Sequence, residues 1–409
     1  MMKKTNLFLV LLMALIVMSC SKDETTMGIP QEGNAIEFGT YVGRDAQTRA
    51  LSVETPALLA SGGGFGVFAY YTGQNVYGTP AIKPNFMYNQ GVTSADAGVT
   101  WTYNPVKYWP NNVDDKVSFF AYAPYSSNTN ITVPAVADFT AGDPTITFAV
   151  NGAAKQQVDL LYADATENMK NRIKNGTTAA NKIGVNEKIT FKFKHALARI
   201  GFNVEALVDQ VNGNETGGTD SDATTGTIPT DTKIVVTKVE LIGSFYPSGT
   251  LNLNNTVANT PIWTPGTAAV RTFELTPTEN FVSAVAYGET GNQTTGQLVT
   301  SATAKQKLNN DASYLMVIPQ NFDGTGTNEA TKIKVKVTYD VITKDTSLNT
   351  GQSKVTNEIT SSDFAFDFAA GKAYTFNLHL GMTSVKFDAD VTGWDEQTGT
   401  VVNVPINTN

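Results

Sequence analysis

The chain has 409 residues, a formal net charge of −8 and 41% hydrophobic residues, enough for two domains with cores of normal size. Charged residues make up only 16%, below the roughly 25% of an average soluble protein. Thr, Asn, Gly and Ser take their place, which is typical of extracellular β-proteins. The acidic balance excludes nucleic acid as a partner, because phosphate binding needs clustered Lys and Arg. The single cysteine, Cys20, excludes disulfides, cysteine metal sites and thiol nucleophiles from the rest of the chain.

Residues 1–20 have the pattern of a secretory signal. Lys3 and Lys4 precede an apolar run, Leu7–Met18, which is too short to span a bilayer as a helix, since that takes about 20 residues. The run ends in Val17-Met18-Ser19-Cys20, which resembles the lipobox of bacterial lipoproteins. We therefore expect Cys20 to be acylated and to become the mature N-terminus. An ordinary signal peptide with an incidental cysteine is the alternative.

Residues 21–49 are predicted to form a tether and a strand that can be removed. Ser21-Lys22-Asp23-Glu24 resembles the surface-export signal of Bacteroidetes lipoproteins, and a solvated tether is a compatible interpretation. Ile36, Phe38 and Val42 lie two or four positions apart, which indicates a strand over 35–42. The polar stretch 43–50 has no periodic pattern and is expected to be an exposed loop.

Strand patterns separated by turn signals fill the remainder of the chain. They predict an all-β fold with long loops and little helix, and the alternation of Lys with Val or Ile in 333–337 indicates antiparallel sheet with one face in water. The predicted strands are Gly66–Tyr71, Val117–Ala123, Ile189–Lys194, Ile200–Val204, Ile234–Ile242, Tyr314–Ile318, Ile333–Tyr339 and Tyr374–Leu380. One short helix is expected around Asp164–Lys174.

A polar, Gly- and Thr-rich segment, Glu205–Lys233, is predicted to be a mobile loop near the middle of the chain. We place the domain boundary just before it. The expected units are an N-terminal domain over 50–187 and a C-terminal domain over 188–409.

The C-terminal tail contains two further strand patterns, Val385–Asp390 and Thr400–Ile406. Val402, Val404 and Ile406 alternate in the second pattern, and Pro405 suits an edge position because it has no N–H. This tail is a candidate donor strand for another subunit. The alternative is that it completes its own domain.

Residue patterns for catalysis or metal binding are absent. The two histidines, His195 and His379, lie in alternating strands and are expected to be structural, and no HExxH, GxSxG or P-loop pattern occurs. Gly62-Gly63-Gly64 is interpreted as a turn, and Asp114-Asp115 as a solvated turn rather than as the paired acids of a glycosidase. No cofactor or metal is expected, and the chain is predicted not to be an enzyme.

Several stretches together resemble the fimbrillin-like family of Bacteroidetes, whose members build type V pili. In chain order they are Ile36-Glu37-Phe38, Thr48-Arg49-Ala50, Trp101–Pro110, Phe119–Pro124, Val158–Ala163, Phe191–Ile200, Gly371–Leu378 and Val391–Trp394. Each is a weak match alone, but their order spans nearly the whole chain.

The resemblance implies two tandem β-sandwich domains of transthyretin-like type. It also implies export as an outer-membrane lipoprotein, cleavage after an arginine by an arginine-specific or trypsin-like protease, and assembly with other pilin subunits by strand exchange at the cell surface. The residues agree, because Arg49 lies before the small residue Ala50 in a predicted loop, where a protease can reach the backbone. Arg44 and Arg49, two of only five arginines, share this loop.

On this hypothesis the protein is a shaft or tip subunit that serves in adhesion to a host protein or glycan. One alternative is a surface glycan-binding lipoprotein, in which Trp101, Tyr103, Tyr108 and Trp109 stack on sugar rings. We expect these aromatic residues to lie in the core instead. A glycosidase is the other alternative.

Overall fold

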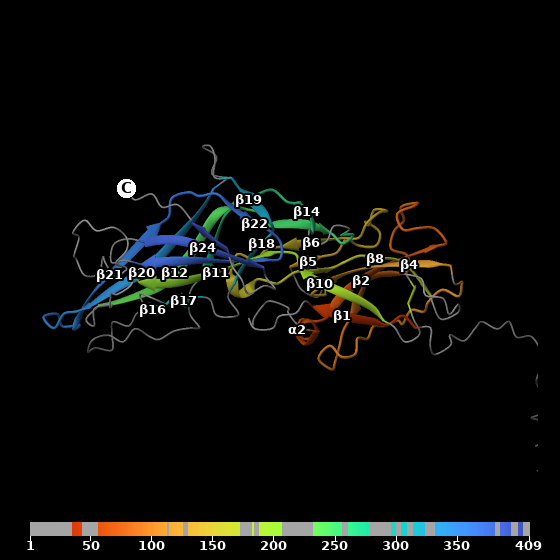
Figure 1. The fold of residues 1–409 in the computed structure, drawn as a ribbon, viewed down its shortest axis with the longest axis horizontal. Coiled ribbons are helices and arrows are strands. Elements are labelled where there is room, and N and C mark those ends of the chain that lie inside the picture. Colours follow the sequence, from red (N-terminus) through yellow and green to blue (C-terminus); the bar gives the residue numbers. More distant parts are fainter. Residues whose placement is uncertain are drawn as a thin grey trace, which may run out of the picture.

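The computed structural model describes residues 35–42, 56–112, 114–125, 130–171, 182–183, 188–206, 232–255, 261–275, 277, 296–299, 304–308, 314–323, 332–380, 385–393 and 400–403. Strands dominate this part of the chain. Within it, helix is limited to α2 (Pro56–Ser61) and one 3₁₀ turn, η1 (Ala154–Gln156). The prediction of an all-β fold is confirmed. Figure 1 shows an elongated molecule with β1, β2 and β4 toward one end and β12, β20 and β21 at the other.

The first sheet has eight strands in the order β1-β10-β7-β4-β2-β3, with β8 paired to β4 and β9 paired to β8. Its strands are β1 (Phe38–Val42), β2 (Phe65–Gly73), β3 (Met87–Val92), β4 (Lys116–Ala123), β7 (Leu161–Ala163), β8 (Thr166–Asn171), β9 (Lys182–Ile183) and β10 (Ile189–His195). The strands predicted at 66–71, 117–123 and 189–194 all lie here. Gly62-Gly63-Gly64 forms the predicted turn ahead of β2, and Gly63 and Gly64 have positive φ.

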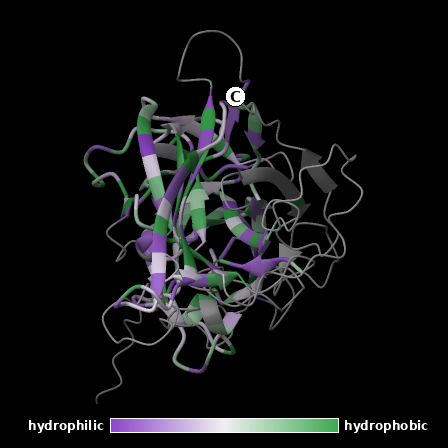
Figure 2. Cartoon of the chain, turned by 90° about the vertical axis from the view of Figure 1, so that its left-hand side faces the viewer, coloured by the Kyte–Doolittle hydropathy of each residue, from purple (hydrophilic) through white to green (hydrophobic). Residues whose placement is uncertain are grey.

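Two further sheets form the other end of the molecule. The second has the order β17-β11-β23-β24-β25 with β18 on β11, and the third has the order β15-β12-β20-β21 with β16 on β12. Their strands are β11 (Ala198–Ala206), β12 (Thr232–Phe245), β15 (Ala269–Leu275), β16 (Gln297–Val299), β17 (Gln306–Lys307), β18 (Leu315–Val317), β20 (Ile333–Lys344), β21 (Gln352–Thr360), β23 (Lys372–Leu380), β24 (Val385–Gly393) and β25 (Thr400–Asn403). Figure 2, viewed from this end, shows hydrophilic and hydrophobic residues alternating along strands, as expected for sheets with one buried face.

A four-stranded sheet, β14-β13-β6-β5, and a two-stranded sheet, β19-β22, lie between the two ends (Figure 1). The strands are β5 (Ile131–Thr132), β6 (Thr145–Ala149), β13 (Ser248–Asn252), β14 (Ile262–Pro265), β19 (Gln320–Phe322) and β22 (Phe366–Phe368). Because β6 pairs with β13, this sheet joins the first half of the chain to the second. The proposed division at residue 188 precedes β10, which belongs to the first sheet. The chain changes sheet at Ala196-Leu197, between β10 and β11.

Alternate residues of β2 and β4 face two different cores. Phe65, Val67 and Phe119 point into a core that also contains Phe38, whereas Phe68 and Phe120 point into the larger core that continues into the second and third sheets. This is the two-residue period of a strand buried on both faces. The first sheet therefore separates the core that contains Phe38 from the larger core.

The helix expected around Asp164–Lys174 is wrong. Residues 166–171 form the strand β8, in which Met169 lies opposite Val117 and Lys170 opposite Lys116 of β4. Residues 172–174 lie outside the described residues. Pairing with an available edge of β4 outweighs the weak local helix preference of the segment, because tertiary context overrides propensity.

Candidate functional site

The strand ahead of residue 50 lies at one edge of the first sheet. β1 runs parallel to β10, with Phe38 opposite Ile189 and Val42 opposite Phe193. The N–H of Ile189 donates a hydrogen bond to the carbonyl oxygen of Glu37 at 2.9 Å. Among the described strands, β1 pairs with β10 alone. Loss of β1 would therefore expose the edge of β10 that β1 covers.

Two side chains of this segment are inserted into the core. Ile36 and Phe38 are each 1% exposed. The Phe38 ring contacts four aromatic rings, at centroid distances of 5.2 Å to Tyr103, 5.6 Å to Phe191, 6.0 Å to Phe119 and 6.2 Å to Phe65. The side chain of Val42 lies outside the described residues. Burial of Ile36 and Phe38 together is worth roughly 3–6 kcal/mol.

Polar interactions hold the segment less completely. The ion pair between Glu37 and Lys188 is long, at 3.9 Å, and both side chains are exposed, so it contributes little. Thr40 Oγ1 is buried and has no hydrogen-bond partner among the described residues, which costs about 1–3 kcal/mol. The segment is therefore held chiefly by main-chain hydrogen bonds and two apolar side chains, which a strand of another sequence can also supply.

The loop over 101–109 closes over the start of this segment. The N–H of Ile36 donates to the carbonyl oxygen of Lys107 at 2.8 Å, and the hydroxyl of Tyr103 donates to the carbonyl oxygen of Ile36 at 2.7 Å. Burial raises the pKa of Tyr103 to about 12, so its hydroxyl stays protonated and remains a donor over the physiological range. We call Ile36, Tyr103 and Lys107 the entry clamp.

The tryptophans of this loop are core residues. Trp101 and Trp109 are 7% and 6% exposed and contact Phe65 and Phe119 at 4.9 Å and 5.9 Å between ring centroids. They cannot stack on a sugar ring in solvent. Tyr103 is half-buried and Tyr108 is exposed. The expectation that these aromatics belong to the core therefore holds for the tryptophans and in part for Tyr103. It is wrong for Tyr108, whose side chain lies on the surface.

The predicted modification residues precede or follow this segment. Cys20, Arg44, Arg49 and Ala50 lie outside the described residues. The described chain resumes at Pro56 with α2, which lies against β1. The path from β1 to the rest of the protein thus passes through the residues that contain Arg49.

The candidate donor tail lies on its own C-terminal sheet. β25 is an edge strand that pairs antiparallel with β24, with Val402 opposite Ala389 and Asn403 opposite Asp388. The side chain of Val402 is not described, and Val404 and Ile406 lie outside the described residues. In this state the tail completes its own sheet, which is the alternative that the sequence left open.

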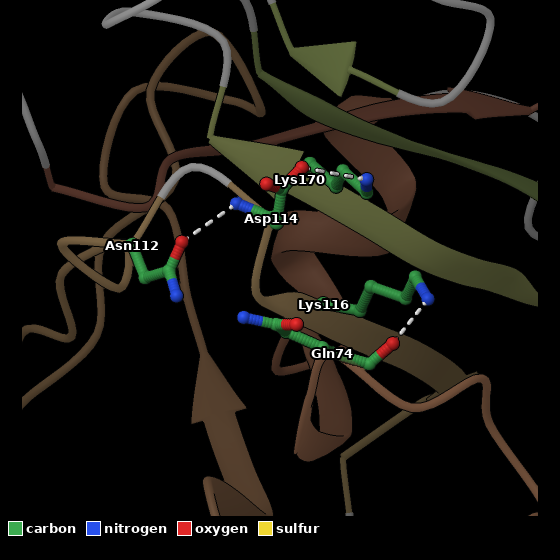
Figure 3. A network of polar contacts seen from close by, with 5 residues as sticks. All are labelled: Gln74, Asn112, Asp114, Lys116 and Lys170. Atoms are coloured by element: carbon green, nitrogen blue, oxygen red, sulfur yellow. Dashed lines mark hydrogen bonds and ion pairs between the residues drawn. The ribbon is translucent and has the colours of Figure 1, made fainter.

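The acidic pair considered for glycoside hydrolysis has other partners. Asp114 accepts a hydrogen bond from Lys170 of β8 at 3.2 Å, and its N–H donates to Asn112 Oδ1 at 3.1 Å (Figure 3). Lys116 donates to the carbonyl oxygen of Gln74 nearby (Figure 3). Asp115 is buried and accepts from the hydroxyl of Tyr71 at 2.6 Å. These contacts connect residues near the ends of β2, β4 and β8.

Both histidines pair with carboxylates. His195 Nδ1 lies 3.0 Å from Asp159 Oδ2, with side chains 3% and 0% exposed, and His379 Nδ1 lies 2.5 Å from Glu205 Oε1. In the part of the chain that the structure describes, no group of three or more His, Cys, Asp or Glu side chains could hold a metal ion. None of the described helices is long and apolar enough to cross a membrane.

The sequence predicted the strand over 35–42 but not the aromatic residues that surround Phe38. Phe65, Phe119 and Phe191 surround Phe38. Phe119 and Phe191 lie in predicted strands, whereas Phe65 precedes the strand predicted at 66–71. The Trp101–Pro110 motif indicated core aromatics, but its role as a clamp depends on main-chain oxygens, for which a sequence carries no signal.

Comparison with known proteins gives a consistent result along the whole chain. The family model described as fimbrillin-like matches residues 48–394. Fimbrium subunit Fim1C of Phocaeicola vulgatus is 28% identical over 410 residues, covering 97% of this chain and 98% of that protein. The crystal structure of a fimbrial protein from Bacteroides vulgatus is similar with a TM-score of 0.61 and 25% identity, covering 88% of this chain and 99% of that one.

Proposed function

We propose, from the premise that this chain belongs to the fimbrillin-like family, that it is built into a cell-surface fimbrium by losing β1 and accepting a strand from a neighbour. The chain is a fimbrial subunit and not an enzyme, as its fimbrial relatives indicate. The observation that carries the assembly proposal is the position of the segment 35–42. It contains the edge strand β1, and its Ile36 and Phe38 fill a core that the rest of the domain encloses.

Export as a lipoprotein is the first step of the proposal. Acylation of Cys20 would attach the precursor to the outer membrane, since each buried CH₂ of an acyl chain contributes about 0.8 kcal/mol. The two proposed domains cover residues 50–187 and 188–409, and the chain changes sheet at Ala196-Leu197. Both domains would fold with β1 in place. The Phe38 site is then filled and the β10 edge is paired, which would protect the precursor from aggregation during transit.

Cleavage after Arg49 by an arginine-specific or trypsin-like protease is the second step. It would disconnect β1 from α2 and allow the segment to leave. Departure would expose the backbone edge of β10 and the Phe38 site between Phe65, Phe119 and Phe191. An extended segment with apolar side chains at alternate positions fits such a site through main-chain bonds and side-chain pockets.

A strand from another subunit would fill the vacancy. The tail with Val402, Val404 and Ile406 is the proposed donor, because β25 is an edge strand that can separate from β24 without breaking a central pairing. One donor per acceptor, arranged head to tail, produces an open filament rather than a closed ring. As a shaft or tip subunit, the assembled protein would serve in adhesion to a host protein or glycan.

Mass spectrometry of the protein released from cells tests the proposed maturation. We expect a mature form that begins at Ala50, and we expect the Arg49→Ala variant to remain a lipid-bearing precursor without filaments in electron microscopy. Arg44→Ala is the matched control, since Arg44 lies in the same stretch, and it should mature normally. Filaments built from chains that still begin at Cys20 would contradict the proposal.

A further inference from the structure

A shallow pocket lies beside the entry clamp, on the surface of the first domain. It has a volume of about 470 Å³, and its lining comes from the end of β3, from 93 and 102–104 and from Tyr125. Ligand sites in proteins typically occupy about 300–1,000 Å³. The pocket shares Tyr103 with the surroundings of Phe38, and it is present while β1 is in place.

The chemistry of the lining is polar but uncharged. Tyr103 and Tyr125 contribute aromatic surface, and the amides of Gln90 and Asn104 contribute donors and acceptors. The threonines Thr93 and Thr102 also line the pocket. None of the lining residues carries a charge. A phosphate, carboxylate or ammonium group would find no ionic partner among them, whereas a ligand with hydroxyl groups and apolar C–H faces matches both parts of the lining.

Three of the lining side chains, Gln90, Tyr103 and Tyr125, are held in place before any ligand arrives. Gln90 Nε2 donates to the carbonyl oxygens of Asn104 at 3.1 Å and Gly91 at 3.3 Å, which fixes the amide and leaves its carbonyl oxygen as an acceptor. The Tyr125 ring packs on Gly91 so closely that a Cβ there would lie 2.9 Å from its Cζ. Tyr103 is fixed by the hydroxyl contact to Ile36. A site ordered in advance loses less conformational entropy on binding.

The loop behind the pocket is also fixed. Thr93 and Thr102 exchange main-chain hydrogen bonds at 2.9 Å and 2.8 Å. Asp96 Oδ1 accepts from the N–H of Thr100 and from the hydroxyl of Ser94, both at 2.7 Å, and these bonds, the one from Thr100 first, lower the pKa of Asp96 to about 2. The lining contributed by residues 93 and 102 is therefore fixed by main-chain hydrogen bonds.

We propose that this pocket binds a neutral saccharide, with a sugar ring against Tyr125 and its hydroxyl groups bonded to Gln90 and Asn104. In the arrangement considered from the sequence, Trp101, Tyr103, Tyr108 and Trp109 provided the stacking surface, and of these four only Tyr103 lines the pocket. Saccharide binding does not require cleavage at Arg49 or strand exchange, so its test uses the precursor with β1 in place.

An array of neutral oligosaccharides, probed with the purified full chain, provides the first measurement. Saturation-transfer NMR with the best binder then measures affinity for the unchanged protein and for three variants. We expect about tenfold weaker binding for Tyr125→Ala, the loss of one good aromatic contact. Asn104→Ala should weaken binding by a similar factor, because it removes the amide donor and acceptor that would bond the sugar hydroxyl groups.

Tyr108→Ala is the control, since Tyr108 is an exposed tyrosine of the same loop that does not line the pocket. It should bind like the unchanged protein. Asn104→Ala keeps the test valid if Tyr125→Ala fails to fold, because Asn104 is exposed. The proposal is overturned if no neutral oligosaccharide of the array binds, or if the folded Tyr125 and Asn104 variants bind as well as the Tyr108 control.

Discussion

Replacing Phe38 with alanine should lower the free energy of unfolding of the first domain by about 3–5 kcal/mol in the full precursor, the usual cost of deleting a buried aromatic ring. Phe38 is 1% exposed and contacts four aromatic rings. The cavity cannot collapse easily, because its walls come from strands of one sheet and from the clamp loop. Urea unfolding followed by tryptophan fluorescence measures the change, since Trp101 and Trp109 lie in the same core.

Tyr41→Ala is the matched control for this prediction. Tyr41 is an aromatic residue of the same strand but is 45% exposed, and surface substitutions usually change stability by less than about 0.5 kcal/mol. If both variants lost the same small amount, the side chains of β1 would not anchor it, and the apolar vacancy required for strand exchange would not exist.

Replacing Asp159 with alanine should destabilise the protein by about 3 kcal/mol, because it leaves the buried side chain of His195 without its carboxylate partner. His195 ends β10, one residue before the chain changes sheet. The loss should therefore affect the junction of the first sheet with the rest of the protein. Thermal or urea unfolding of the purified chain gives the measurement.

Asp159→Asn tests the cause of this loss. The amide keeps an oxygen that can accept from His195, so we expect a smaller cost of about 1 kcal/mol. His379→Ala is a second comparison, since the pair with Glu205 is partly exposed and should contribute about 1 kcal/mol or less. Equal losses for Asp159→Ala and Asp159→Asn would show that the buried hydrogen bond does not stabilise the junction.

Side-chain periodicity predicted which segments are strands but not which strands are neighbours. The alternation in 36–42, 189–194 and 333–339 located β1, β10 and β20. It did not predict that β1 runs parallel to β10 or that β6 pairs with β13 across the two halves of the chain. Periodicity reports the buried face of a strand, whereas register and partner depend on long-range contacts.

The residues of the candidate site were likewise predictable only in part. Buried Ile36 and Phe38 follow directly from their spacing, because a half-buried strand places every second residue inside. The entry clamp and the saccharide pocket depend on main-chain oxygens of Ile36, Lys107 and Asn104. Those groups are the same in every residue, so only the folded arrangement of the loop over 101–109 makes them specific.

Hydrogen–deuterium exchange of the β10 amides that face β1, within 189–193, tests the central claim most directly. The account predicts slow exchange in the precursor, where the N–H of Ile189 donates to Glu37. It predicts fast exchange in monomers cleaved after Arg49 and slow exchange again in assembled filaments, since amides exchange when their hydrogen bonds are lost. Exchange that stays equally slow in cleaved monomers would show that the groove never opens, and would contradict assembly by replacement of β1.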